Sequence, residues 1–176
     1  MSSANHGGGN ANFKVLSEAE FPPEVKAKVL AARDALFGKL ISRLTEVLMK
    51  AGPADAITVC SQEAPEFARA VSVEHGLQIG RTSLKLRNPQ NKPPAWVESI
   101  VDASLVQPTF GRVGEQQFGA LLPIRLQEVC LLCHGTPTNL APGVPEKLAE
   151  LYPDDKAVGY RDGELRGWFW IEIGPQ

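Results

Sequence analysis

Apolar residues recur at helical spacing over the segment 22–51, and the pattern predicts that this segment is the longest element of the chain. Pro22 and Pro23 open the segment, while Gly52 and Pro53 follow it, so both ends carry helix-boundary signals. Polar residues fill the intervening positions, which favours an amphipathic helix lying on the protein surface. The apolar positions are Val25, Val29, Leu36, Leu40, Ile41, Leu44, Val47 and Leu48.

A second helical segment is predicted from about residue 54 to His75. Ile57 and Cys60 lie three residues apart on one face of this segment. Pro65 fits the first turn of a helix better than a helix interior, so we expect a kink or break over 61–64. Gly76 can adopt the left-handed conformation that ends a helix, which leaves His75 in the last turn.

Strand patterns occupy much of the remaining chain. Partial alternation predicts a strand over 78–86, and a dense turn signal follows over 88–94. A short helix is predicted over 95–105, and further strands over 116–124 and 166–173. Helices in the first half and strands in the second favour an α+β fold with an antiparallel sheet.

Composition narrows the class of protein. The 176 residues are 43% hydrophobic and 22% charged, as in one ordinary globular domain. Residues 1–12 are rich in Gly, Asn and Ser and are predicted to be a flexible tail, leaving 13–176 as a single domain. No apolar run approaches the 18 or so residues of a membrane span, and a net charge of −2 argues against non-specific nucleic-acid binding.

The most informative motif is Cys130-Leu-Leu-Cys133-His134. Cys-x-x-Cys-His is the pattern of covalent c-type haem attachment, because two thiols must reach two vinyl carbons while the adjacent imidazole binds the iron. The motif therefore predicts one covalent haem c, with Cys130 and Cys133 as thioethers and His134 as an iron ligand.

Thioether formation implies maturation outside the cytosol, so we expect a periplasmic or otherwise exported protein. Its natural export signal is expected to be missing from this sequence, which opens on no basic and apolar leader pattern.

Two other interpretations of the motif compete with haem. A thioredoxin-like dithiol would need the motif to open a long helix after a parallel strand, and the segment 139–145 does not have a helical pattern. A structural zinc site could be completed by Cys60, although adjacent Cys133 and His134 would be strained as ligands of one tetrahedral ion.

The ligand opposite His134 is the open question at this point. Met49 would give a His/Met electron-transfer cytochrome, and His75 would give bis-histidine ligation, although a histidine in a last helical turn is more often solvated. Cys60 is the third cysteine of the chain, and it could equally be a small buried hydrophobic residue. A lysine, a tyrosine, or no protein ligand at all also remains among the alternatives.

Several segments together resemble a known family, the PAS-like c-type haem sensors first described in cyanobacteria. The resemblance covers about residues 22–173. It implies a PAS-like fold, one covalently bound haem and an unusual His/Cys axial pair, which carries over as His134 and Cys60. The matching segments are Ala56-Ile-Thr-Val-Cys60, Gly80-Arg-Thr-Ser-Leu-Lys-Leu-Arg-Asn-Pro89, Cys130-Leu-Leu-Cys-His-Gly135, Tyr152-Pro-Asp-Asp155, Gly159-Tyr-Arg161 and Leu165-Arg-Gly167.

A basic string lies in the predicted strand 78–86 and just beyond it. Arg81, Lys85 and Arg87 are separated by even intervals, so a continuous strand would place all three on one face. That face would suit haem propionates or an anionic partner, or it could be a solvated strand face.

Three functions from different classes follow. The family resemblance favours a redox or small-ligand sensor, in which a Cys60 thiolate keeps the potential low and can leave the iron on reduction, opening a position for CO or NO. A low-potential electron carrier is the alternative, and it would retain both ligands. We expect no enzymatic activity, because a peroxidase-like site needs an open position and a nearby base. The sequence does not identify a signalling or redox partner.

Overall fold

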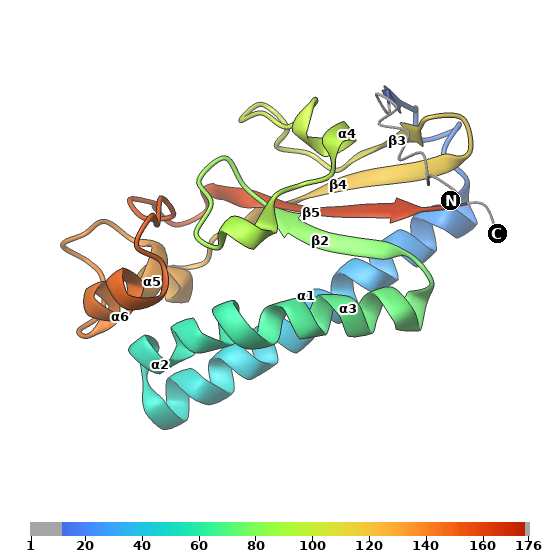
Figure 1. The fold of residues 1–176 in the computed structure, drawn as a ribbon. Coiled ribbons are helices and arrows are strands. Elements are labelled where there is room, and N and C mark those ends of the chain that lie inside the picture. The colour runs from blue at the N-terminus through green and yellow to red at the C-terminus, as the bar shows by residue number, and fades with distance from the viewer. Residues whose placement is uncertain (1–11, 175–176) are drawn as a thin grey trace, which may run out of the picture.

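The computed structural model describes residues 12–174, and it is built around one antiparallel sheet (Figure 1). The strands are β1 (Phe13–Val15), β2 (Gln78–Thr82), β3 (Thr109–Val113), β4 (Gln117–Arg125) and β5 (Leu165–Ile173). Their order across the sheet is β1-β3-β4-β5-β2, and every neighbouring pair is antiparallel. The predicted α+β class with an antiparallel sheet is confirmed.

The helices lie between β1 and β5 along the chain. They are α1 (Pro23–Ala51), α2 (Pro53–Thr58), α3 (Ala64–His75), α4 (Ala95–Glu98), α5 (Leu131–His134) and α6 (Val144–Leu151). The long N-terminal helix is confirmed with nearly the predicted bounds. Gly52 ends it with φ of 90°, and Gly76 ends α3 in the left-handed conformation, as expected of the residue that follows a helix.

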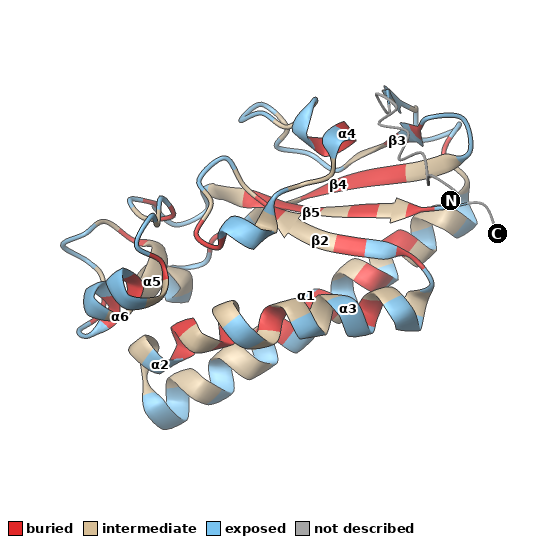
Figure 2. Cartoon of the chain, in the orientation of Figure 1, coloured by how far each residue is buried: buried red, intermediate tan, exposed pale blue. Residues whose placement is uncertain are grey.

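Helices α1 and α3 cover one face of the sheet (Figure 1). Figure 2 shows the buried positions of both helices turned toward the strands. Leu36 and Leu40 of α1 and Val71 of α3 belong to the same buried cluster as Phe169 and Ile171 of β5. The helical and strand periodicities of the sequence thus converge on one core.

A smaller core covers the opposite face. Trp96 and Val97 of α4 pack with Leu121 and Trp168, which alternate with inward residues of the first core along their strands. The indole nitrogen of Trp96 donates to Glu172 at 2.9 Å, and that of Trp168 donates to the Leu105 carbonyl at 2.8 Å. Both buried indoles are therefore hydrogen-bonded.

A third cluster lies beyond the end of the sheet, where α2, α5 and α6 meet (Figure 1). Ile57 of α2 is buried against Val144 and Leu148 of α6 and against Tyr152. This contact joins the helix before Cys60 to the chain that follows the Cys-x-x-Cys-His motif. It fixes the distance between the two parts of the chain that carry the candidate ligands.

Several local predictions need correction. The expected break over 61–64 is a π-helical turn, Val59–Glu63, that joins α2 to α3 without interrupting the helical path. The strand predicted over 78–86 ends at Thr82, because the Ser83 hydroxyl bonds the Arg166 carbonyl at 2.6 Å and accepts from the Lys85 amide at 3.0 Å. These side-chain bonds replace the strand ladder with a turn.

Other elements were shortened or not predicted. The helix expected over 95–105 spans only Ala95–Glu98, and strands β1 and β3 and helices α5 and α6 were not predicted. The predicted tail 1–12 lies outside the described residues apart from Asn12. Within 12–174, no helix combines the length and the apolar character that a bilayer crossing requires.

Candidate functional site

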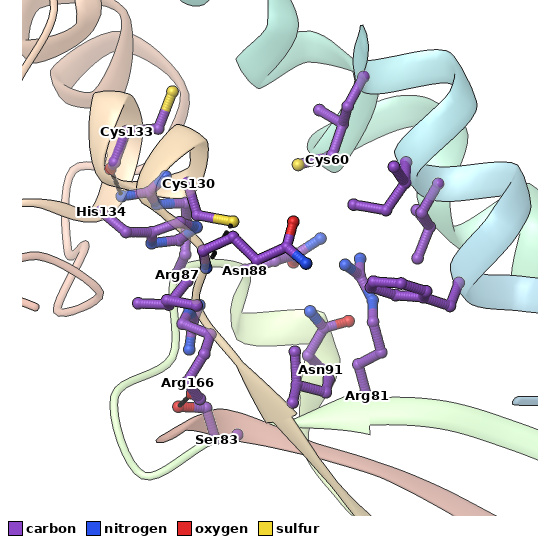
Figure 3. Close-up of a pocket in the computed structure, with 18 of the residues that line it drawn as sticks. Cys60, Arg81, Ser83, Arg87, Asn88, Asn91, Cys130, Cys133, His134 and Arg166 are labelled. Atoms are coloured by element: carbon purple, nitrogen blue, oxygen red, sulfur yellow. Dashed lines mark hydrogen bonds between the residues drawn. The ribbon is translucent and has the colours of Figure 1, made fainter. Parts of the chain in front are cut away.

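A cavity of about 310 Å³ opens between the helices and the end of the sheet (Figure 3). The C-terminal half of α1 forms an apolar wall through Phe37, Ile41, Leu44 and Leu48. The π-helical turn, the loop after β2 and the Cys-x-x-Cys-His segment supply the other walls. Cys60, Cys130, Cys133 and His134 all line this one cavity, so the fold brings together residues that are far apart in the sequence.

The motif lies on a short helical stretch directly after β4. A 3-10 turn (Glu128–Cys130) leads into α5, whose four residues end at His134. Because 3.6 residues make one helical turn, Cys130, Cys133 and His134 fall on neighbouring positions of one helical face. Gly135 ends the helix at a crowded position, where a Cβ would lie 2.6 Å from the Leu131 carbonyl oxygen.

His134 is oriented by a backbone acceptor. Its Nδ1 lies 2.7 Å from the carbonyl oxygen of Ala157, and since a carbonyl can only accept, Nδ1 carries the proton. The lone pair is then on Nε2, which is the arrangement that a metal-binding imidazole needs. Burial, with the positive charges of Arg87 and Arg166, holds the pKa of His134 well below its ordinary value.

Arg87 is buried beside the motif, where its guanidinium holds several groups. It pairs with the Asp155 carboxylate through Nε to Oδ1 at 3.2 Å and Nη2 to Oδ2 at 3.1 Å. Its Nη2 also donates to the carbonyls of Cys133 at 2.6 Å and Ala157 at 3.2 Å. The loop after β2 is thereby tied both to α5 and to the carbonyl that accepts from His134.

Cys60 faces the motif from the other side of the cavity. Figure 3 shows its sulfur pointing into the space between the π-helical turn and the wall that holds Cys130 and His134. The π-helical turn begins at Val59, so Cys60 occupies a local irregularity of the kind that is frequent at functional sites. Among the described residues, no side-chain hydrogen bond engages the Cys60 thiol.

The other candidate ligands do not reach this cavity. Met49 is 83% exposed near the end of α1, and His75 ends α3 next to β2. Neither residue lines the cavity. Of Met49, His75 and Cys60, it is Cys60 that lines the cavity together with His134.

One end of the cavity is cationic. Arg81, Arg166, Asn88 and Asn91 line it together with Arg87. Burial lowers the pKa of Arg166, as do the positive charges of Arg87 and Arg81, while Tyr160 acts in the opposite sense. Since the Asp155 carboxylate is already paired with Arg87, this end carries positive charge that an anionic ligand would neutralise.

The expectation that Arg81, Lys85 and Arg87 share one strand face is wrong. The strand ends at Thr82, so only Arg81 belongs to it. Lys85 is exposed, does not line the cavity, and donates to the Val158 carbonyl at 3.0 Å. Arg87 turns inward to Asp155, and its buried position was not apparent from an alternating pattern.

Tyr152 supplies a further observation on what the cavity can hold. Its hydroxyl is buried without a hydrogen-bond partner among the described residues, although the side chain lines the cavity. Burial is the main cause that raises the pKa of Tyr152, while the Ser61 side chain acts in the opposite sense, so the hydroxyl stays protonated as a donor. A ligand with acceptor oxygens, such as the propionates of a haem, would satisfy this hydroxyl. The apolar walls and the cationic end of the cavity also fit a haem.

The two competing interpretations of the motif are not supported. The sheet in residues 12–174 contains only antiparallel ladders, which is not the parallel context of a thioredoxin-like dithiol. Across those same residues, no three His, Cys, Asp or Glu side chains gather closely enough to form a zinc site. Burial raises the pKa of the Cys133 thiol to about 11, so this cysteine is not an activated dithiol nucleophile.

The structure also reveals site residues that were not predicted. Arg166, Asn88 and Asn91 line the cavity, and Asp155 and the Ala157 carbonyl hold Arg87 and His134. An arginine in the otherwise apolar strand pattern 165–171 is the one signal that could have identified Arg166. Backbone carbonyls such as that of Ala157 leave no signal in residue types.

Comparison with known proteins agrees with this architecture. Among curated proteins, no sequence matches the chain. A solved structure, the crystal structure of the cyanobacterial haem protein Tll0287, superposes with a TM-score of 0.63 at 24% sequence identity and covers 88% of this chain and 97% of that one. The model of the Tll0287-like family matches residues 14–174, so the chain belongs to the Tll0287-like family.

Proposed function

We propose that this chain is a monohaem c-type cytochrome that senses redox state or a small ligand. Cys130 and Cys133 would hold the haem through thioethers, and His134 and Cys60 would bind the iron. The proposal is supported by the Cys-x-x-Cys-His motif, by the position of Cys60 across the same cavity, and by a family relative that is a haem protein.

The cavity walls match the two kinds of surface that haem presents. Apolar side chains from α1 suit the macrocycle, and Arg81, Arg166 and the Tyr152 hydroxyl suit the propionates. When bound, the haem supplies one-electron chemistry and an axial position for a ligand. The protein residues decide which oxidation state and which ligand are favoured.

Of the two proposed iron ligands, Cys60 would have the stronger influence on the reduction potential of the haem. A thiolate is an anionic donor, and a partly buried site penalises the additional negative charge that arrives on reduction. Thiolate ligation therefore favours the oxidised form and predicts a low potential. Protonation of the Cys60 sulfur would weaken it as a ligand, and a reduced haem held here would then be able to bind CO, NO or a similar molecule.

The observation that carries the sensor proposal is the difference between the two candidate ligands. His134 is held by the Ala157 carbonyl, whereas the Cys60 thiol has no hydrogen bond within residues 12–174. A low-potential electron carrier needs both ligands to stay in place in both oxidation states. An unrestrained thiol instead suits a ligand that leaves.

The proposed function also has consequences for where the protein matures and how it signals. Covalent attachment requires delivery of haem outside the cytosol, so the protein would be exported and mature in the periplasm or an equivalent compartment. A change at Cys60 would move the π-helical turn between α2 and α3, which could be communicated to a separate partner protein. We propose a regulatory role and no enzymatic one.

The direct test compares the wild-type protein with Cys60→Ala after expression in a host that attaches c-type haem. The absorption and EPR spectra of the ferric wild type should have the low-spin signature of thiolate ligation. Cys60→Ala should lose that signature while keeping the covalent haem by mass spectrometry. A low-spin spectrum that the substitution leaves unchanged would exclude Cys60, and bare polypeptide from such a host would exclude haem attachment.

A further inference from the structure

The buried ion pair between Arg87 and Asp155 is an unusual feature of this small protein. The two side chains are only 6% and 9% exposed. A buried ion pair contributes little net stability, because the desolvation of both charges offsets their attraction. A specific structural role therefore explains the pair better than a general contribution to stability.

Together, Arg87 and Asp155 form hydrogen bonds to both backbone groups of Ala157. Asp155 Oδ1 accepts from the Ala157 amide at 2.9 Å, while Arg87 Nη2 donates to the Ala157 carbonyl at 3.2 Å. The same carbonyl accepts from His134 Nδ1 at 2.7 Å. Ala157 is thus fixed through both its amide and its carbonyl, and within residues 12–174 its carbonyl is the hydrogen-bond partner of the His134 side chain.

Arg87 also holds the helix that bears the imidazole. Its Nη2 donates to the Cys133 carbonyl at 2.6 Å, one residue before His134. The guanidinium therefore connects the backbone of His134 with the acceptor of its side chain. Both bonds come from Nη2, whose direction is fixed because the planar guanidinium also pairs with Asp155 through Nε.

We propose that Arg87 and Asp155 are positioning residues that fix the orientation and the tautomer of His134. The pair holds the Ala157 carbonyl where it keeps the proton on Nδ1, and it leaves Nε2 free on the cavity side. Arg87 also shares that carbonyl with the imidazole, which limits how strongly the carbonyl polarises the ring. The consequences at an iron rest on the proposed function, whereas the tautomer of His134 does not.

The first test measures the tautomer in the reduced full chain without haem, by nitrogen NMR of ¹⁵N-labelled histidine. Arg87→Lys keeps the charge but loses the fork, and Asp155→Asn keeps the shape but loses the charge. We expect the wild type to hold His134 in the Nδ1-protonated form and Arg87→Lys to lower the ratio of the two tautomers at least tenfold. Glu66→Gln, which breaks the exposed pair with Arg69 on α3, is the matched control and should change nothing.

The second test uses the haem-loaded protein and the midpoint potential, which a merely structural role would not move in a predictable direction. Asp155→Asn leaves the Arg87 charge uncompensated near the site and disfavours the oxidised state. We expect at least a tenfold rise in the ferrous-to-ferric ratio at fixed potential, equivalent to 59 mV for one electron. Arg87→Lys should leave the potential closer to wild type and broaden the low-spin EPR signal.

The two tests separate this inference from the proposed function. An unchanged His134 tautomer in Arg87→Lys would overturn the positioning role, as would a potential in Asp155→Asn equal to that of Glu66→Gln. If a variant does not fold without haem, its loaded form still supplies the potential. A wild type that fixes the tautomer but never acquires haem would contradict the proposed function and leave the positioning role intact.

Discussion

The two walls that present His134 and Cys60 are built in different ways. His134 lies on a helix of only four residues, but the surrounding chain holds it: its Nδ1 is bonded to Ala157, and its own carbonyl accepts from the Tyr160 amide at 3.0 Å. Cys60 lies within a long helical path, yet at the π-helical turn, where its thiol has no hydrogen bond among the described residues.

Regular secondary structure and rigidity are therefore separate properties of this site. The short helix α5 is fixed by tertiary hydrogen bonds, while the long helical path from α2 to α3 contains a local irregularity where Cys60 lies. An imidazole held in place and a thiol left free are what a site needs if one ligand is permanent and the other exchangeable. The same arrangement would be a disadvantage in a carrier that must reorganise little on electron transfer.

The largest expected effect distinguishes the cysteines of the two walls. The double variant Cys130→Ala/Cys133→Ala should lose covalent haem completely, because both thioethers are removed. Cys60→Ala should retain it in full. Mass spectrometry of protein from a maturation-competent host measures both, and equal loss in the two variants would remove the distinction between the walls.

A large effect on stability is expected where the two walls are joined. Ile57 is 2% exposed and packs against the cluster of α6, so Ile57→Ala should lower the free energy of unfolding by about 2–5 kcal/mol. Val73→Ala is the matched control, since Val73 is 84% exposed on α3. Denaturant unfolding compares them, and similar losses in both would show that Ile57 does not hold the walls together.

The free energy of unfolding should depend on pH through His134. The pKa of His134 is held well below the ordinary value of 6.5 in the folded chain, chiefly by burial. As pH falls below 6.5, His134 binds up to one more proton in the unfolded chain than in the folded chain, so stability falls with pH, by up to about 1.4 kcal/mol per pH unit.

This pH dependence is measured on the haem-free chain between pH 6.5 and 5 by denaturant unfolding. His134→Gln should remove this component, and His75→Gln should retain it. A pH slope that is the same in wild type and His134→Gln would contradict the burial of a neutral imidazole on this wall.

The smallest effects on the haem spectra are expected from substitutions of Met49 and His75, the two candidate ligands that lie outside the cavity. Met49→Leu and His75→Gln should leave the ferric absorption and EPR spectra unchanged, because neither residue lines the cavity. The spectra should overlay those of the wild type. A lost low-spin signal in either variant would mean that the Cys60 wall is not the one facing His134.

Patterns with a strong period were predictable from the sequence. The spacing of Val29, Leu36 and Leu40 identified α1, and Gly76 marked the end of α3, because helices repeat a simple rule over many residues. The Cys130–His134 motif was equally clear as a pattern of residue types, because its members are close together in the sequence. These features depend on neighbours in the sequence, which one chain displays directly.

Features that depend on distant parts of the chain were not predictable. The strand after Gln78 was extended too far because the bond from Ser83 to Arg166 joins residues 83 positions apart. Arg87 has the residue type of a surface cation, and only the fold brings Asp155 to it. The π-helical turn at Cys60 likewise gave a signal at Pro65 but no indication of its geometry.

The most direct test of a fixed His134 and an exchangeable Cys60 is the absorption spectrum of the ferrous protein with and without CO across a range of pH. CO should bind to the wild type more readily as pH falls, because protonation of the Cys60 sulfur releases it, and Cys60→Ala should bind CO at every pH. A ferrous wild-type spectrum that stays six-coordinate and does not respond to CO at any pH would contradict this prediction.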